Sequence, residues 1–280
     1  MANLASLRPA ELLGALAEGL GLVVEHVAAL EQIAGRQEGP GAARAVEVLR
    51  VVSDEEAGKF LILLDVARCA DAEPALKADQ LRKAGNHIAK GIYQRAVDIR
   101  PADFAELLRF AKGLRASHYL DGPNDVDWIF RNEIEAEREE KLYVDYVATD
   151  DGDSWYSPSR YDDVGPDYPS GAVELVLAMS RAGFCSVEVL MAMVEAWRDF
   201  RPQPETHWSE CRDLNRATLE RIPAEVVDAD LSDQEISRIV NTWPFPMYDV
   251  DLRKIDVKLE ELRERQRNWS PDGWGRGDYY

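Results

Sequence analysis

A mostly α-helical bundle, with a small β-hairpin or loop insertion and further helices after it, is the fold that this 280-residue sequence predicts. Apolar residues recur at three- and four-residue spacing along much of the first 120 residues, as they do on the buried face of a helix. Short segments rich in glycine or proline separate these stretches. Helices joined by short connections pack antiparallel, so the first part of the chain is expected to form a four-helix bundle.

The first 120 residues are expected to hold four helices. They cover about residues 9–34, 42–70, 76–97 and 101–116. The segment from Gly35 to Gly41 ends the first helix, and Pro74 follows the second. Pro101 lies in the first turn of the fourth, where the missing N–H of proline is tolerated.

The pattern changes at Asp121. Residues 125–141 are helical in pattern but acidic, residues 142–147 alternate as in a strand, and Asp150–Pro158 is turn-rich, acidic and aromatic. Further helices are expected at about residues 170–182, 186–200, 205–221, 232–242 and 252–266. We therefore divide the chain into a helical bundle (1–120), an acidic, aromatic-rich hairpin or loop segment (121–168), a C-terminal helical extension (169–268) and a flexible tail (269–280).

Composition indicates a soluble, cytoplasmic protein. Apolar residues make up 46% of the chain and charged residues 30%, and glutamates at positions 11, 18 and 25 interrupt the apolar N-terminal stretch, so no membrane span or leader is expected. Three widely spaced cysteines without a Cys-x-x-Cys pair predict neither disulfides nor a zinc framework.

The net charge of −19 is unevenly distributed: residues 1–122 carry a net −2 and the remainder −17. Such acidity disfavours general binding of nucleic acid, and no DNA specificity is expected. It does not exclude a small local anion site, because charges are screened within about 10 Å.

The predicted third helix carries the most informative residue pair, Arg82 and His87. An imidazole transfers protons near neutral pH, and a guanidinium binds phosphate oxygens. On a helical projection, one face holds Arg82, Lys83, Asn86, His87, Lys90, Tyr93 and Gln94. Residues 74–95 contain five basic residues and one acid, so this face is either an anion site or an ordinary basic stripe facing solvent.

Charged residues also interrupt the apolar pattern of the second helix, at Ser53–Lys59. One interpretation is an intrahelical pair between Glu55 and Lys59. The other is that Glu55 or Glu56 pairs across the bundle with Arg82 or His87 and fixes the orientation of that side chain.

No metal or cofactor site is expected. The acidic run Asp150–Asp153 lacks the ligand spacing of an EF-hand and fits a solvated turn. His207 and Cys211 are four residues apart, but two ligands do not make a zinc site. Nucleotide-binding and hydrolase motifs are missing from the sequence.

The order of several short motifs is similar to that of a known family. These are Asp54–Lys59, Asn86–Lys90, Leu142–Tyr146 and a turn with Gly152, Trp155 and Pro158. Over about residues 10–160 the chain resembles the AbiV family of bacterial abortive-infection proteins, which belongs to the HEPN superfamily. The resemblance implies a four-helix bundle that dimerises and carries an Arg-x4-6-His ribonuclease motif, which the spacing of Arg82 and His87 fits.

The resemblance implies an anti-phage endoribonuclease that works as a homodimer without metal. Arg82 and His87 would be the catalytic pair, Lys83, Asn86, Lys90 and Tyr93 would bind RNA, and Glu55, Glu56 and Lys59 would orient or line the site. A phage-encoded activator or neutralising partner is also implied. One histidine per chain supplies one proton-transfer group, so a dimer would bring acid and base together.

A non-catalytic role is the alternative. Residues 121–167 hold fifteen acids and four basic residues, interspersed with aromatic side chains. Such a segment suits binding to a phage or host protein, or an acidic cap over the basic helix.

Overall fold

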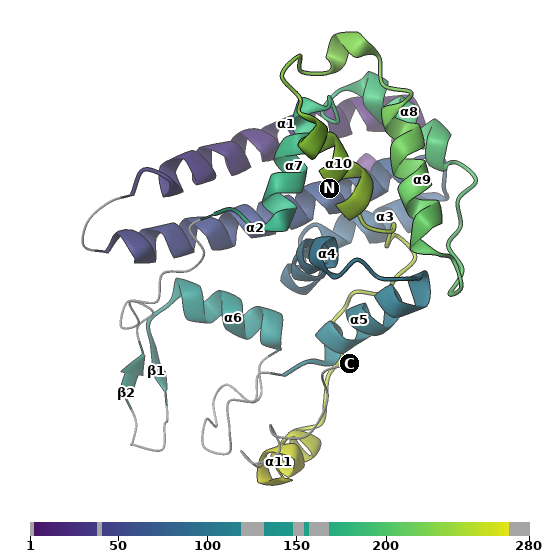
Figure 1. Ribbon diagram of the computed structural model, residues 1–280. Helices are drawn as coiled ribbons and strands as arrows, with labels where there is room; N and C mark the ends of the chain where they lie inside the picture. Colours follow the sequence, from purple (N-terminus) through teal and green to yellow (C-terminus); the bar gives the residue numbers. More distant parts are fainter. Residues whose placement is uncertain (1–2, 38–40, 119–131, 148–153, 157–167, 269–280) are drawn as a thin grey trace.

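The computed structural model describes residues 3–37, 41–118, 132–147, 154–156 and 168–268, and it confirms the prediction of a mostly α-helical bundle (Figure 1). Its elements are η1 (Leu4–Ser6), α1 (Pro9–Ala34), α2 (Ala42–Arg68), α3 (Pro74–Lys83), α4 (His87–Ile99), α5 (Phe104–Ala116), α6 (Glu133–Leu142), β1 (Asp145–Val147), β2 (Ser154–Tyr156), α7 (Gly171–Arg181), α8 (Val187–Trp197), α9 (Trp208–Leu219), η3 (Ala224–Val226), α10 (Asp233–Thr242) and α11 (Leu259–Asn268).

Helices α1 and α2 form a long hairpin (Figure 1), and α3, α4, α6, α7 and α8 pack against one or both of them. The apolar stripe of α1 and the C-terminal half of α2 are buried in its core. Helix α4 lies against α2, and α6 contacts both. Each apolar side chain buried in this core stabilises the fold by about 1.5 to 3 kcal/mol. The core therefore fixes the positions of α2 and α4, which carry predicted site residues.

Helices α7 to α10 share this core. Helix α7 packs against α1, α2 and α4, and α8 packs against α1 and α2. Their buried side chains belong to the same hydrophobic cluster as those of the first four helices. The C-terminal helices therefore complete the bundle.

Helices α2 and α4 approach one another most closely at Gly58. A Cβ atom built on Gly58 would lie 2.4 Å from the carbonyl oxygen of Lys90. Real Cβ atoms do not come so close to a backbone oxygen, so only glycine permits this helix spacing. The spacing in turn sets the distance between α2 and α4 side chains one turn away.

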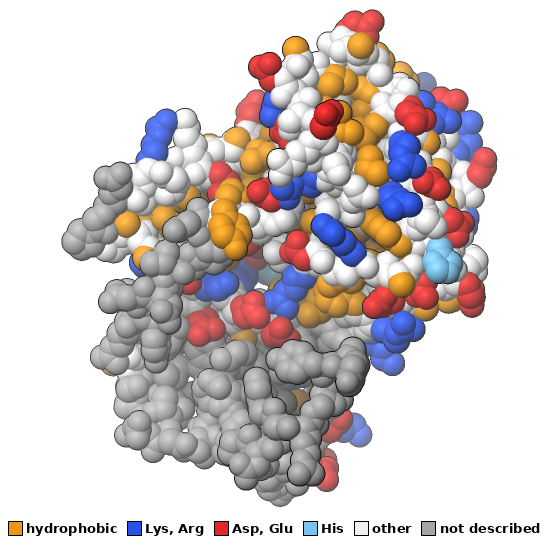
Figure 2. Space-filling model, viewed as in Figure 1, with side chains coloured by type: hydrophobic (Ala, Val, Ile, Leu, Met, Phe, Trp, Pro, Cys, Tyr) orange, Lys and Arg blue, Asp and Glu red, His pale blue; other side chains and the backbone are white. Residues whose placement is uncertain are grey.

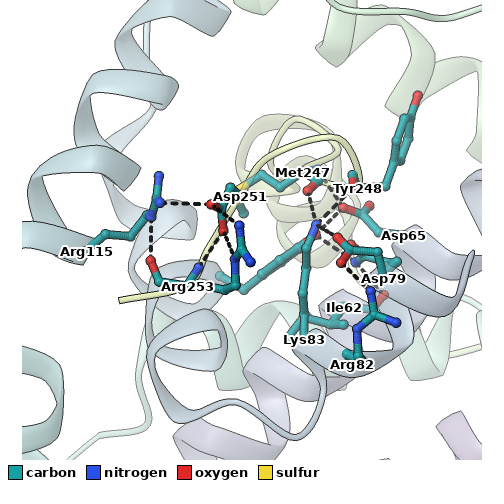
Figure 3. A network of polar contacts seen from close by, with 12 residues as sticks. Ile62, Asp65, Asp79, Arg82, Lys83, Arg115, Met247, Tyr248, Asp251 and Arg253 are labelled. Atoms are coloured by element: carbon teal, nitrogen blue, oxygen red, sulfur yellow. Dashed lines mark hydrogen bonds and ion pairs between the residues drawn. The ribbon is translucent and has the colours of Figure 1, made fainter. Parts of the chain in front are cut away.

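A buried polar network fastens the segment after α10 to the bundle. Asp65 on α2 forms an ion pair of 2.9 Å with Arg68 and accepts hydrogen bonds from the Met247 amide at 2.7 Å and the Tyr93 hydroxyl at 2.6 Å. Lys83 donates to the Met247 and Tyr248 carbonyls, each at 2.9 Å (Figure 3). Buried charges need such partners, so residues 65–83 and 247–248 hold each other in place.

The predicted helix over residues 76–97 is wrong in one respect, because it is two helices. Helix α3 ends at Lys83, and α4 begins at His87. Asn86 takes a β-region conformation and its side chain accepts a hydrogen bond from the Ala89 amide at 2.9 Å, which is an N-cap. The apolar spacing continues across this break and hides it.

Other boundaries also shift. Helix α5 begins at Phe104, capped by Asp103, so Pro101 precedes the helix and does not occupy its first turn. Strands β1 and β2 pair antiparallel with Tyr146 opposite Trp155. The predicted turn at 150–153, most of the acidic segment and the predicted tail at 269–280 lie outside the described residues.

Judged by length and composition alone, α1 is the one described helix that is long and apolar enough to cross a membrane. The sequence had been expected to hold no such stretch. Here nine of its residues, including Leu12, Leu16 and Leu20, are buried in the protein core.

Candidate functional site

The break between α3 and α4 places Arg82 and His87 in different surroundings. Arg82 lies in the last turn of α3, with a side chain that is 70% exposed and paired with Asp79 at 2.7 Å. It lines a pocket of about 430 Å³ together with Asp249, Asp251 and Arg253. His87 lines a different pocket. The structure therefore does not bring the two residues of the predicted catalytic pair to one pocket.

Two of the predicted RNA-binding residues are in the core. The Lys83 side chain is buried against main-chain carbonyls, and burial lowers its pKa despite the nearby Asp79. Tyr93 is 1% exposed, and its hydroxyl lies between Asp65 and Gln80. The prediction that Lys83 and Tyr93 lie on an exposed polar face is wrong, because residues far along the chain cover that face.

Asn86 and Lys90 are also engaged within the protein. Asn86 caps α4, as described above. Lys90 is buried and donates to Glu55 Oε2 at 2.8 Å. Lys90 is thus turned to Glu55, whereas the half-buried Asn86 lines the Arg82 pocket together with Lys83.

Glu55 is the centre of a charged cluster. Its carboxylate lies 2.6 Å from His87 Nδ1, 2.8 Å from Lys90 Nζ and 2.7 Å from Arg138 Nε. Burial alone would raise the pKa of Glu55, but the hydrogen bonds and charges of Lys90 and His87 outweigh burial and lower the pKa. Glu55 is thus an anion that holds His87 by Nδ1, which leaves Nε2 for another partner.

Of the two interpretations of Glu55, the cross-bundle contact with His87 is the one present. The intrahelical pair expected between Glu55 and Lys59 is replaced by one between Glu56 and Lys59, at 3.0 Å. In the described part of the chain, Glu56 and Lys59 do not line the His87 pocket.

The His87 pocket has a volume of about 170 Å³ and lies between α2, α4 and α6. The His87 side chain is 46% exposed, which makes it accessible. Three cations that the sequence reasoning missed line the same pocket: Arg95, Arg138 and Lys141. Helix α6 was interpreted as acidic, and the register of Arg138 and Lys141, three residues apart on one face, was the signal that it also presents cations.

The cations of the pocket differ in their availability. Arg95 forms ion pairs with Glu133 at 3.0 Å and Glu137 at 2.7 Å. Lys141 is exposed, and its charge acts on Asp54 in the same pocket. Acidic and basic side chains are interspersed over the face that Figure 2 shows, so an anion site here is local.

Asp54 is a further pocket residue that the sequence reasoning missed, although it begins the Asp54–Lys59 motif. Its Oδ1 atom accepts a hydrogen bond of 2.5 Å from the Ser170 hydroxyl, which also caps α7. Burial raises the pKa of Asp54 from 3.8 to about 6 against the opposing effect of Ser170. Asp54 therefore titrates close to the pH range in which an imidazole does.

The raised pKa of Asp54 predicts that stability depends on pH. The folded state holds this proton more tightly than the unfolded state, so stability falls as pH rises from about 4 through about 6. Asp54→Asn is expected to raise the free energy of unfolding by about 2 kcal/mol at pH 7 and by little at pH 4. Urea denaturation at both pH values measures the difference, and an equal effect at the two would contradict it.

Within the described residues, no group of three His, Cys, Asp or Glu side chains is arranged to hold a metal ion. Cys69, Cys185 and Cys211 are free thiols, and burial raises the pKa of each. The groups of the His87 pocket that could take part in a reaction are therefore its titratable side chains, which transfer protons.

Comparisons of the chain with protein-family models, with curated proteins and with solved structures found no match.

Proposed function

We propose that the chain is an endoribonuclease of anti-phage defence that cleaves RNA at the His87 pocket without a metal ion. The observation that supports this most is the accessible His87 held by Glu55 in a pocket that cations line. Such a histidine transfers protons, and neighbouring cations stabilise the charge that develops on a phosphate during cleavage.

The phosphate contact in this proposal differs from the one that the motif spacing implies. Arg82 lines another pocket, and Lys90 is occupied by Glu55. Lys141, aided by Arg138, is the better candidate because it lines the pocket and is exposed. His87 Nε2 would exchange a proton with the ribose 2′-OH or the departing 5′ oxygen, which leaves a 2′,3′-cyclic phosphate or a 3′-phosphate.

RNA cleavage in EDTA tests this proposal. Wild-type protein is expected to cleave total RNA, and His87→Ala is expected to reduce the rate by about 100-fold or more, as loss of a general acid or base does. The RNA fragments are then ligated to adapters that join only to a 5′-hydroxyl or a 3′-phosphate end, and sequencing of the ligated fragments identifies the ends. Cleavage that survives His87→Ala would remove His87 from the reaction, and cleavage that EDTA abolishes would remove the metal-independent mechanism.

Arg82→Ala and Lys141→Ala together test which cation contacts the phosphate. Because Arg82 lies outside the His87 pocket, its loss is expected to change the rate by less than about threefold, whereas Lys141→Ala is expected to slow cleavage by about tenfold or more. A larger loss of rate in Arg82→Ala than in Lys141→Ala would identify Arg82 as the phosphate contact.

The homodimer, and the phage-encoded activator or neutralising partner, belong to the same proposal. A protein that is inactive alone but cleaves RNA after infection would support the activator.

A second candidate function, binding of a phage or host protein, is favoured by the exposure of Tyr143, Val144, Trp155 and Tyr168 in the acidic segment. Large exposed apolar side chains gathered in one region mark interaction sites.

A further inference from the structure

We propose that Asp54 is the second proton-transfer group of the His87 pocket, so that a single chain holds both the acid and the base of the cleavage reaction. This inference rests on the proposed ribonuclease function. It changes the expectation that a second copy must supply the other proton-transfer group. The homodimer then serves a purpose other than completing the acid–base pair.

The geometry places both groups on one pocket from two helices. Asp54 lies on α2 and His87 begins α4, and the close approach of these helices at Gly58 fixes their separation. Ser170 holds Asp54 by Oδ1, and Glu55 holds His87 by Nδ1. Each group therefore has one atom fixed by the protein and a second, Oδ2 or Nε2, with which to meet a substrate.

The surroundings of the adjacent carboxyl groups of Asp54 and Glu55 shift their pKa values in opposite directions. Glu55 accepts hydrogen bonds from His87, Lys90 and Arg138, and burial, which would raise its pKa, is outweighed by Lys90 and His87, which lower it and keep Glu55 an anion. Asp54 is largely buried, which raises its pKa to about 6. A pair of acids separated in this way is typical of sites in which one orients and the other transfers a proton.

Several charged groups face Asp54 and set its titration. These charges are on Glu31 in α1, Arg50 in α2 and Lys141 in α6, and the Ser170 hydroxyl before α7 adds a hydrogen bond. His87, Arg95 and Arg138 line the same pocket. Lys141 and Arg50 favour the carboxylate, while Glu31 opposes it. Burial exceeds all of them, so Asp54 takes up a proton near pH 6 and is a carboxylate above that pH.

The reaction moves one proton from the 2′-OH to the 5′ oxygen. The Asp54 carboxylate takes the proton of the 2′-OH, and that oxygen forms a bond to phosphorus. The bond from phosphorus to the 5′ oxygen breaks, and protonated His87 gives its Nε2 proton to that oxygen. The products are a 2′,3′-cyclic phosphate and a 5′-hydroxyl, and water carries the proton from Asp54 back to His87.

Asp54→Asn tests the role, and Asp98→Asn is its matched control. Asp98 also has a pKa raised by burial and lies against the start of α7, but it lines a different pocket. In single-turnover cleavage in EDTA, Asp54→Asn is expected to lower the rate by about 100-fold or more while the protein melts at a higher temperature at pH 7. Asp98→Asn is expected to cleave like wild type.

The pH profile separates proton transfer from a structural effect. The wild-type rate is expected to rise with pH through about 6 as Asp54 ionises, and this acidic limb should disappear in Asp54→Asn. Ser170→Ala removes a hydrogen bond that lowers the pKa of Asp54, so the limb should move to higher pH. A limb that neither variant changes would overturn the assignment.

The outcomes also separate this inference from the proposed function. If wild type cleaves, His87→Ala does not, and Asp54→Asn cleaves within threefold of wild type, then Asp54 has no proton-transfer role and the ribonuclease stands. If purified wild type fails to cleave with or without extract from infected cells, the ribonuclease function and the role of Asp54 are both overturned.

Discussion

Asp65→Ala is expected to lower the free energy of unfolding by about 3 to 5 kcal/mol, the typical effect of removing one partner from a buried ion pair. The Asp65 and Arg68 side chains are each 1% exposed and lie 2.9 Å apart. The guanidinium carbon lies over the rings of both Trp197 and Trp243, at 3.9 and 3.8 Å from their centroids. Arg68 thus cannot reach water when Asp65 is lost, and the Tyr93 hydroxyl and Met247 amide lose their acceptor as well.

The chain offers a closely matched control for this variant. Asp79 and Arg82 have the same three-residue spacing and a similar distance of 2.7 Å, but their side chains are 51% and 70% exposed. Solvent screens such a pair, so Asp79→Ala is expected to change stability by less than about 0.5 kcal/mol. Urea denaturation of both variants measures the contrast, and similar losses for the two would show that burial does not set the strength of the Asp65 contacts.

Gly58→Ala is expected to lower stability by about 3 kcal/mol and RNA cleavage by about 100-fold. The added methyl would lie 2.4 Å from the carbonyl oxygen of Lys90 and 3.1 Å from its Cα. Backbone atoms cannot rotate away as a side chain does, so α2 and α4 must separate. Glu55 lies three residues before Gly58 and His87 three residues before Lys90, and the separation therefore lengthens the contact that holds His87.

Gly19→Ala in α1 is the control for this variant. Its added Cβ would meet nothing within 4 Å, so the exchange is expected to stabilise the helix by about 0.5 to 1 kcal/mol and to leave cleavage unchanged. Thermal unfolding and the EDTA cleavage assay test both. A Gly58→Ala protein as stable and active as wild type would mean that α2 and α4 separate without disturbing the site.

Much of the fold follows from local sequence. The stripe on residues 9–34 and the glycines after it predict α1, and periodicity also places α7 to α10 within a few residues. The helix expected at 252–266 begins only at Leu259. Periodicity failed at residues 84–86, where the apolar spacing runs on in phase while Asn86 caps a new helix. A capping residue next to Gly85 was present in the sequence and outweighs the apolar pattern.

The candidate site was less predictable, because a helical projection says which residues share a face but not what covers that face. Lys83 and Tyr93 were placed in solvent, yet partners some 160 and 30 residues away bury them. His87 was identified correctly as accessible, and its contact with Glu55 was one of two alternatives. Asp54 was overlooked because its importance comes from burial, which no local pattern reports.

The network that joins Asp65 and Lys83 to residues 247–248 has a consequence for how the protein is made. A ribosome releases chain from the N-terminus, at about 5 to 20 residues per second. Helices α2 to α4 emerge long before Trp243 and Met247, so during most of synthesis the Asp65–Arg68 pair lacks the Trp243 ring and the Met247 amide that contact it in the folded protein. These contacts of α2 and α3 can therefore form only when the chain is nearly complete.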